Sequence, residues 1–406
     1  MLNKSYEETL DWLFQQFPSY QKIGSKAYKP TLENTENLLK EIGNPEKDLQ
    51  FIHIAGSNGK GTTCSILASI LTESGYRVGL FTSPHIKDFR ERIRVNGEMI
   101  SEQKVIDFVE KIKSKKRDFA PSFFEVSFTM ALDHFRSEQC DICIIETGLG
   151  GRLDATNVIS PVCSVITSIS LEHTNILGDT HEAIAKEKAG IIKDLKPVVL
   201  GHMPVEALET IKQISRERHA PFFNAIEQEK LALFDESNPE YMRYNILVAL
   251  KVIDLIALDG FTTNQDAIRA GMQKLSDNTG YRARLDQIAS SPNVFLDVSH
   301  NVEGINATLS VFKDKFLHIV YGSSSDKNLV EIASIFPKNA RLYLTSFNHA
   351  RSANLNDLKE AFNKSVSEHI SYFNDPQEAF IQAKKNAKDD ETILVMGSFF
   401  LLENFY

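Results

Sequence analysis

The chain has 406 residues, of which 42% are hydrophobic and 24% charged, and its formal net charge is −9. This length and composition are typical of a globular protein with two or three domains and an ample core. The acidic balance argues against a broad nucleic-acid surface and a polybasic membrane anchor. No segment reaches the ~18 apolar residues of a membrane span, and the N-terminus lacks the apolar core of a signal peptide. We therefore expect a cytoplasmic protein with neither a nucleic-acid nor a membrane partner.

In the first part of the chain, short apolar runs alternate with amphipathic runs of helical period. These runs predict strands at 51–55, 77–81, 142–146, 162–169 and 197–200, and helices near 64–74, 102–113, 125–137 and 181–189. The alternation predicts an α/β fold with a mostly parallel sheet, like that of phosphate-loop ATPases. In such sheets ligands bind beyond the carboxyl ends of the strands.

A second set of alternating runs follows. It predicts strands at 294–298, 317–321, 340–345 and 391–396, and helices near 302–313, 329–336, 356–364 and 376–385. We expect a smaller, Rossmann-like α/β domain here. Residues 290–293, Ser-Ser-Pro-Asn, are the best linker candidate,. The predicted domains are therefore residues 1–288 and 293–406.

The most informative segment is a glycine-rich loop between the run at 51–55 and a helix-compatible run. Its residues are Gly56, Ser57, Asn58, Gly59, Lys60, Gly61 and Thr62. Glycines let backbone N–H groups close on phosphate oxygens, a helix N-terminus and a lysine add positive charge, and a hydroxyl can hold Mg²⁺. The spacing departs from G-x-x-x-x-G-K-[ST], because Ile54 replaces the leading glycine and Gly61 separates Lys60 from Thr62. We predict that this loop binds a nucleotide phosphate, with Thr62 as a metal-ligand candidate.

A second motif begins where the run at 142–146 ends in Glu146 and continues into glycines at 148, 150 and 151. In phosphate-loop enzymes an acid at the end of a neighbouring strand holds Mg²⁺ directly or through water. Glycines beside it indicate a crowded loop that a ligand approaches closely. The alternative interpretation is a surface glutamate that merely ends a strand. Glu146 is therefore a candidate metal ligand.

Taken in order, these motifs resemble the folylpolyglutamate synthase and dihydrofolate synthase family, ATP-dependent ligases of the Mur ligase superfamily. The segments that carry the resemblance are 56–62, 83–85, 90–97, 122–125, 146–157, 173–179, 187–193 and 297–301. The resemblance is to the bacterial bifunctional type. It implies ATP, Mg²⁺, L-glutamate and a dihydropteroate or reduced folate as small-molecule partners, and we expect a monomer.

The resemblance also implies the reaction. A pteroate or folate carboxylate attacks the γ-phosphate of ATP and becomes an acyl phosphate, and the amine of glutamate then displaces phosphate. Charge on the transferred phosphoryl group must be neutralised, which calls for Lys60 and Mg²⁺. Whether the chain adds the first glutamate, later ones or both stays open, and the bifunctional form is our expectation.

Residue roles follow from the same resemblance. Ser83, Glu146 and His173 match metal ligands, although nitrogen is an unusual ligand for Mg²⁺. Lys188 matches a lysine that is carbamylated by CO₂, which turns a cation that would repel Mg²⁺ into a carboxylate on a long arm. We expect Lys60, Lys188 and His173 to be the catalytic residues.

The remaining roles concern the nucleotide and the pterin. Nucleotide contacts are expected, besides the glycine-rich loop, at Asn245, Arg284, Asp297 and His300. Pterin-site walls are expected at Ser122, Phe123, Phe124, Glu125, Leu153, Asp154 and Ala155, with Phe123 or Phe124 stacking on a flat ring. The chain departs from the family pattern at 298–299, with Val-Ser for Gly-Ala, and at Ala283 and Asp286, where Gly and Glu are usual.

Two other classes of protein compete with a folate-pathway ligase. A muramoyl amino-acid ligase usually carries a UDP-sugar domain before the phosphate loop, and the roughly fifty residues present there are too few for one. A non-enzymatic nucleotide-binding regulator needs neither metal-ligand candidates nor the motif around Lys188.

Overall fold

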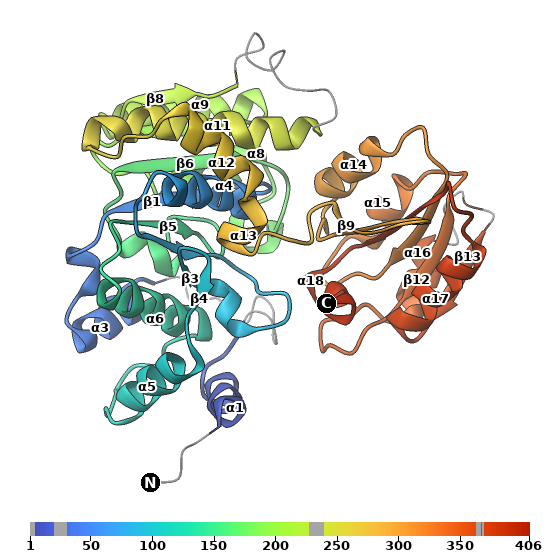
Figure 1. Ribbon diagram of the computed structural model, residues 1–406, viewed down its shortest axis with the longest axis horizontal. Helices are drawn as coiled ribbons and strands as arrows, with labels where there is room; N and C mark the ends of the chain where they lie inside the picture. The colour runs from blue at the N-terminus through green and yellow to red at the C-terminus, as the bar shows by residue number, and fades with distance from the viewer. Residues whose placement is uncertain (1–4, 20–30, 227–238, 363–366, 368) are drawn as a thin grey trace. The chain divides into compact units, whose positions relative to one another are not determined.

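The computed structural model describes residues 5–19, 31–226, 239–362, 367 and 369–406. These residues form two compact units, and the chain passes from one to the other between Tyr281 and Arg282 (Figure 1). Both units are α/β folds, which confirms the predicted fold class. None of the described helices is long and apolar enough to cross a membrane.

The first unit is built on an eight-stranded sheet with the order β4-β3-β2-β5-β1-β6-β7-β8. Strands β2, β5, β1, β6, β7 and β8 are parallel, and β3 and β4 add antiparallel at one edge. The bounds are β1 Phe51–Ala55, β2 Val78–Phe81, β3 Ile93–Val95, β4 Glu98–Met99, β5 Ile142–Glu146, β6 Cys163–Ser168, β7 Val198–His202 and β8 Phe222–Asn224.

Helices cover both faces of this sheet. The described α-helices are α1 Tyr6–Gln16, α3 Glu33–Ile42, α4 Lys60–Glu73, α5 Glu102–Lys113, α6 Phe123–Ser137, α7 Thr174–Leu177, α8 His181–Ala189, α9 Val205–Glu217, α11 Glu240–Ile256, α12 Gln265–Gln273 and α13 Leu275–Thr279. Short 3₁₀ turns lie at η2 Pro45–Lys47, η3 Phe89–Arg92, η4 Ala155–Val158 and η5 Ala257–Asp259.

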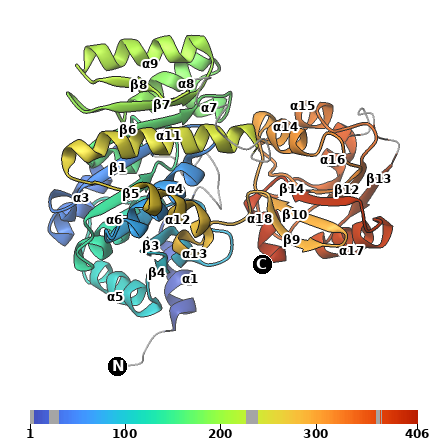
Figure 2. The ribbon, with the colours of Figure 1, turned by 45° about the horizontal axis from the view of Figure 1, so that its top comes forward.

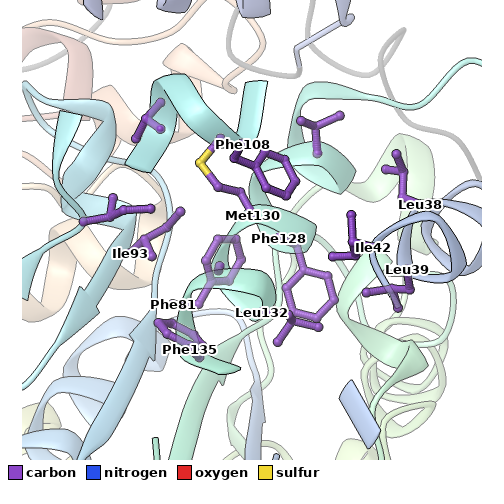
Figure 3. Packing of buried hydrophobic residues seen from close by; sticks show 14 of the residues in the cluster. Leu38, Leu39, Ile42, Phe81, Ile93, Phe108, Phe128, Met130, Leu132 and Phe135 are labelled. Carbon is purple, nitrogen blue, oxygen red and sulfur yellow. The ribbon is translucent and has the colours of Figure 1, made fainter. Parts of the chain in front are cut away.

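Successive residues of the central strands face two different cores, as the two-residue period of a strand requires. Phe51 and Ile145 pack under α1, α3, α5 and α6, in the core that Figure 3 shows from close by. Ile52 and Ile144 pack on the opposite face against α4, α11 and α12, which lie side by side in Figure 2. Because both faces are buried, the loops at the carboxyl ends of the strands are the part of the sheet left to form a site.

The second unit has a six-stranded sheet with the order β13-β12-β11-β14-β10-β9, parallel except for β9. Its strands are β9 Asp286–Ser290, β10 Asn293–Asp297, β11 Leu317–Tyr321, β12 Arg341–Thr345, β13 Ile370–Phe373 and β14 Thr392–Met396. Its helices are α14 Val302–Val311, α15 Leu329–Ser334, α16 Leu355–Phe362, α17 Pro376–Asn386, α18 Phe399–Leu402 and the turn η6 Glu403–Phe405.

The predicted linker at 290–293 is wrong. Strands β9 and β10 pair antiparallel, with Asn293 opposite Ser290, so these residues form the turn of a β-hairpin inside the second unit. The polar Ser-Ser-Pro-Asn composition is common to linkers and to hairpin turns, because both must avoid regular backbone pairing. Composition alone could not separate the two.

Candidate active site

The loop between β1 and α4 leads into a helix whose N-terminus has no side-chain cap among the described residues. Gly59 has φ +84° and precedes α4. In contrast, Ser101, Ser122 and Thr180 cap α5, α6 and α8. The first N–H groups of an α-helix lack partners within the helix and carry partial positive charge. This helix start therefore suits a phosphate group, as the glycine pattern predicted.

The side chain of Lys60 lies over the same loop. Its Nζ donates to the carbonyl oxygens of Gly56, at 2.9 Å, and Ser57, at 3.2 Å. These are backbone acceptors, so the ammonium is held at the loop without an acidic partner in these two bonds. A phosphate bound at the helix start would meet this cation in place.

Strand β6 holds the loop from the other side. The N–H of Asn58 donates to Ser168 Oγ at 2.9 Å, and Thr167 Oγ1 donates to the carbonyl of Asn58 at 2.7 Å. Ser57 Oγ accepts from the N–H of Ser170 at 2.9 Å. Ser57 belongs to the predicted loop, whereas the hydroxyls of Thr167 and Ser168 were not predicted from sequence. The available signal was their place at the end of the predicted strand 162–169, beside the loop of a parallel sheet.

Asn245, on α11, packs directly against the glycine loop. A Cβ built on Gly59 would lie 2.2 Å from Asn245 Oδ1, and Thr63 Oγ1 donates to the same oxygen at 3.4 Å. Thr62 Oγ1 lies 3.4 Å from the hydroxyl of Tyr281. Asn245 thus supports the backbone of the loop, whatever it contacts on a bound nucleotide.

Ser83 and Glu146 come together at the carboxyl ends of β2 and β5. The N–H of Ser83 donates to Glu146 Oε2 at 3.0 Å, and Glu146 stands opposite Ile54 of β1 in the strand register. The carboxylate therefore lies one strand from the glycine loop. Within the described ranges no three His, Cys, Asp or Glu side chains cluster as a metal site. Mg²⁺ beside a nucleotide often takes only one or two carboxylates, with phosphate and water completing its shell, so this oxygen set fits it.

Arg92 is a buried cation beside Glu146. Burial lowers the pKa of Arg92 to about 10, and the Glu146 charge opposes that shift. Its Nε donates to His85 Nδ1 at 2.8 Å, and its guanidinium lies 5.6 Å from the ring centroid of Phe123. The charge of Glu146 is therefore partly balanced without a bound metal. Arg92 lies in the family motif at 90–97, and the sequence alone indicates no role for it.

Lys188, near the end of α8, is buried, with 2% of its surface exposed. Its Nζ donates to the carbonyl of Gly56 and to Glu172 Oε1, both at 2.8 Å. Burial lowers the pKa of Lys188, opposed by the Glu172 charge. Burial alone would raise the pKa of Glu172, but Lys188 and Lys60 hold it well below its usual range. Lys188 is thus not a solvent-exposed helix lysine, and Glu172 is a partner that the sequence reasoning missed.

The loop after Glu146 is interlocked with α8. A Cβ on Gly151 would lie 2.7 Å from the carbonyl oxygen of Lys188, and one on Gly190 would lie 2.4 Å from Arg152 Cα. The N–H of Arg152 donates to the carbonyl of Glu187 at 2.7 Å. Glycine is required at both positions because the two backbones touch. The loop that follows Glu146 and the helix that carries Lys188 therefore form one block.

His173 precedes the short helix α7 with φ +47°. A non-glycine residue in this left-handed region stores backbone strain, which is commonly found at functional sites. Its charge contributes to lowering the pKa of the neighbouring Glu172. His173 thus lies in the electrostatic surroundings of Lys188.

The segment 122–125 forms the N-terminus of α6. Ser122 and Glu125 make a capping box, in which each side chain accepts a hydrogen bond from the backbone N–H of the other. Both are buried. Their polar groups therefore hold the start of the helix, a role that the S-x-x-E spacing itself predicts.

The two phenylalanines between them differ in exposure. Phe123 is 2% exposed, stacks on Phe14 with centroids 4.5 Å apart, and has Arg92 over its ring. Phe124 is partly buried, and a Cβ on Gly148 would lie 2.6 Å from its ring. Of the two expected rings, only Phe124 keeps surface that a flat ligand can contact.

Leu153, Asp154 and Ala155 lead into η4. Asp154 is buried, and its carboxylate accepts from the N–H groups of Gly148, at 2.9 Å, and Leu149, at 2.8 Å. Burial raises the pKa of Asp154, against the effect of these donors. The carboxylate is therefore bound to its own loop.

In the second unit, Asp297 ends β10. Its carboxylate accepts from the N–H groups of Leu285, at 2.8 Å, and Ser299, at 2.9 Å. Burial raises the pKa of Asp297. Ala283 has φ +58°, which explains why glycine is usual there. This arrangement orders the loop that carries Arg284.

His300 follows β10 in the same unit. Its Nδ1 lies 3.0 Å from the carbonyl oxygen of Val298, so Nδ1 carries a proton and donates to that oxygen,.

Family models place the chain among the Mur ligases. Residues 54–245 match the Mur ligase middle domain, and residues 283–399 match the Mur ligase glutamate ligase domain. The first match contains the glycine loop, Glu146 and Lys188, and the second contains Asp297. The protein is therefore a ligase of this class.

Relatives that match along nearly the whole chain identify the family within the Mur ligases. The dihydrofolate synthase/folylpolyglutamate synthase of Bacillus subtilis is 32% identical, over 98% of both chains. The solved structure of Escherichia coli FolC with DHPP and ADP has a TM-score of 0.84 at 27% identity, covering 99% of this chain and 97% of that one. The bifunctional enzyme of Yersinia pestis, crystallised with AMPPNP and Mn ion, has the same values. The chain belongs to the dihydrofolate synthase/folylpolyglutamate synthase family.

Proposed function

We propose that this protein is an ATP-dependent ligase that joins L-glutamate to dihydropteroate and to reduced folates through an acyl phosphate. The observation that carries the proposal is the uncapped start of α4, with Lys60 over it, one strand away from Glu146. That arrangement suits a nucleotide triphosphate and a divalent cation rather than a bare anion. The family membership supplies the substrate class.

Different residues of the chain serve different steps of the reaction. The first-turn N–H groups of α4 and the ammonium of Lys60 hold the phosphates and neutralise charge as the substrate carboxylate attacks the γ-phosphorus and ADP leaves. The glutamate amine then attacks the acyl carbonyl, phosphate leaves and the amine loses a proton. Glu146, with the hydroxyls of Ser83 and Thr62, would hold Mg²⁺, which supplies Lewis-acid stabilisation of phosphoryl charge. His173 joins this set on the family resemblance.

The pterin part of the substrate is assigned to the wall at the start of α6. Phe124 stacks on the ring, while Ser122, Glu125 and Phe123 hold Phe124 in place through capping and packing. Leu153 and Ala155 complete the wall. Asn245, Arg284, Asp297 and His300 are assigned to the nucleotide, directly or through the loops that they order.

The experiment is steady-state ADP release on one preparation, with dihydropteroate and with tetrahydrofolate, each with and without L-glutamate. We expect glutamate-dependent ADP release with both acceptors. Activity with dihydropteroate alone would limit the protein to the first addition, and activity with tetrahydrofolate alone to later ones. Absence of glutamate-dependent release with either acceptor would refute the proposal.

We also propose that Lys188 is carbamylated in the active enzyme. CO₂ reacts with an uncharged amine, and burial of Lys188 lowers its pKa toward that form. Its two present partners, the Gly56 carbonyl and Glu172, are both acceptors and suit an ammonium. A carbamate keeps one N–H for such an acceptor, and its oxygens require a cation nearby.

The test for carbamylation needs a readout other than turnover. Protein equilibrated with ¹³C-bicarbonate and Mg²⁺ should show a carbamate signal by ¹³C NMR, which Lys188→Ala lacks. The variant should also lose most activity, with partial recovery in acetate or formate. A wild-type spectrum without the signal, in active protein, would contradict the assignment.

A further inference from the structure

A chain of hydrogen bonds connects the middle of the sheet to the loop after β5. His53, in β1, is fully buried, and its Nε2 lies 2.8 Å from Thr156 Oγ1. Thr156 Oγ1 in turn donates to Asp154 Oδ1. The other oxygen of Asp154 accepts the N–H groups of Gly148 and Leu149. One end of the chain is therefore in the core and the other end is the loop backbone.

The proton on each member can be assigned. The Thr156 hydroxyl has one proton, which it gives to Asp154, so His53 Nε2 must donate to the hydroxyl oxygen,. His53 Nδ1 is then unprotonated, and it is buried without a hydrogen-bond partner in the part of the chain that the structure describes. A protonated imidazole would bury a second N–H that has no acceptor, which opposes protonation. The chain thus runs in one direction, from His53 to the carboxylate.

The loop that receives these bonds borders two parts of the proposed site. Gly148 lies two residues after Glu146, the candidate metal ligand. Its backbone also touches the ring of Phe124, since a Cβ there would lie 2.6 Å from that ring. A shift of this loop would therefore move the contact surface of Phe124.

We propose that His53 and Thr156 are positioning residues for the ligase reaction. They hold the Asp154 carboxylate in the orientation that fixes the N–H groups of Gly148 and Leu149, and so set the fit of the pterin-bearing substrate against Phe124. Neither residue needs to touch the substrate. The inference rests on the proposed function for its kinetic part.

The decisive comparison is between two substitutions at one position. Thr156→Val keeps the shape of the side chain and removes the hydroxyl, and Thr156→Ser keeps the hydroxyl. We expect Thr156→Val to raise KM for dihydropteroate by roughly fivefold or more, with KM for ATP within about twofold of wild type. The conservative Thr156→Ser should restore the dihydropteroate KM. His53→Leu, which removes the first donor, should act in the same direction as Thr156→Val.

A second measurement reads the loop directly. Hydrogen–deuterium exchange of a peptide spanning 147–155 should be faster in Thr156→Val than in Thr156→Ser, with exchange of the α4 peptide unchanged. This contrast needs no substrate, so it still tests the hydrogen-bond chain if the wild type lacks ligase activity. A purely structural role would lower Tm in Thr156→Val and leave both KM values unchanged, which would overturn the inference. Should Thr156→Val not fold, His53→Leu decides by the same criteria, and failure of both to fold would mark the chain as a folding element instead.

Discussion

Substituting alanine at the two glycines that flank α4 separates backbone strain from steric overlap. Gly59 and Gly75 have φ +84° and +90°, so alanine meets the same left-handed penalty at both. A Cβ on Gly75 meets nothing within 4 Å, whereas one on Gly59 would lie 2.2 Å from Asn245 Oδ1. Gly75→Ala is therefore a matched control for Gly59→Ala.

The expected magnitudes follow from these contacts. Left-handed alanine costs about 1–2 kcal/mol, offset by roughly 0.4–1 kcal/mol from the stiffer unfolded chain, so Gly75→Ala should cost about 1 kcal/mol or less. Gly59→Ala adds overpacking of about 1–3 kcal/mol and weakens the buried hydrogen bond from Thr63 to Asn245. We expect a total loss of about 3 kcal/mol.

The functional effect should differ more sharply. For the new Cβ of residue 59 to reach an ordinary van der Waals distance from Asn245 Oδ1, Asn245 or the glycine loop must move by about 1 Å. A displacement of that size in an active site costs roughly 10²-fold in rate. Urea denaturation and ATP-dependent kinetics on both variants give the comparison. Equal stability losses, or Gly59→Ala with near wild-type kcat/KM for ATP, would refute the reasoning.

Three further predictions concern single side chains. Lys60→Ala should lower kcat by about 10²–10³-fold with a small change in Tm, because the hydrogen bonds of its Nζ within the described residues go to two backbone carbonyls,. Near-normal turnover would exclude Lys60 from phosphate contact. In protein kept free of CO₂ and bicarbonate, where Lys188 is an ammonium, Glu172→Leu should cost roughly 3–5 kcal/mol in urea unfolding, because it leaves the buried cation without its acidic partner,. Glu172→Leu with Lys188→Met should recover most of that stability while activity stays lost. Equal losses of stability in the single and the double variant would argue against the ion pair. Burial lowers the pKa of His53 to about 3, so below its unfolded pKa the unfolded chain binds more protons. The contribution of His53 to stability should then fall by about 2 kcal/mol from pH 7 to pH 5, and His53→Leu should remove that part of the pH dependence, as urea unfolding at the two pH values would measure.

The parts of the site that lie within one motif were predictable from sequence. The glycine loop follows one apolar run and Glu146 ends another, and both runs are neighbouring strands with the expected bounds. The capping box at Ser122 was also readable, yet its residues were assigned to the pterin wall. The S-x-x-E spacing is consistent both with a capping box and with the family motif. In the structure the polar atoms of Ser122 and Glu125 form the capping box.

Contacts between distant segments could not be predicted. Phe123 and Phe124 are indistinguishable in sequence, and the difference comes from Phe14 of α1, which covers one ring. Lys188 lies in a helix with several polar residues, and its buried amine is held by Glu172 and the Gly56 carbonyl, which come from distant parts of the chain. Such pairings depend on which surfaces the fold brings together, and strand or helix period carries no information about them.

The interlock of Gly151 with the backbone of α8 has a consequence for protein engineering. Lys193 Nζ adds bonds to the carbonyl and side-chain oxygens of Asn157, at 2.8 and 2.9 Å, so the contacts continue past the helix. The loop after Glu146 and the segment 187–193 are therefore shaped to each other at the backbone. A chimera that takes the loop from one homologue and α8 from another would join mismatched surfaces, whereas exchanging the two segments together keeps them matched. Libraries aimed at acceptor choice can instead vary Phe124, which is partly exposed and lies outside this interlock.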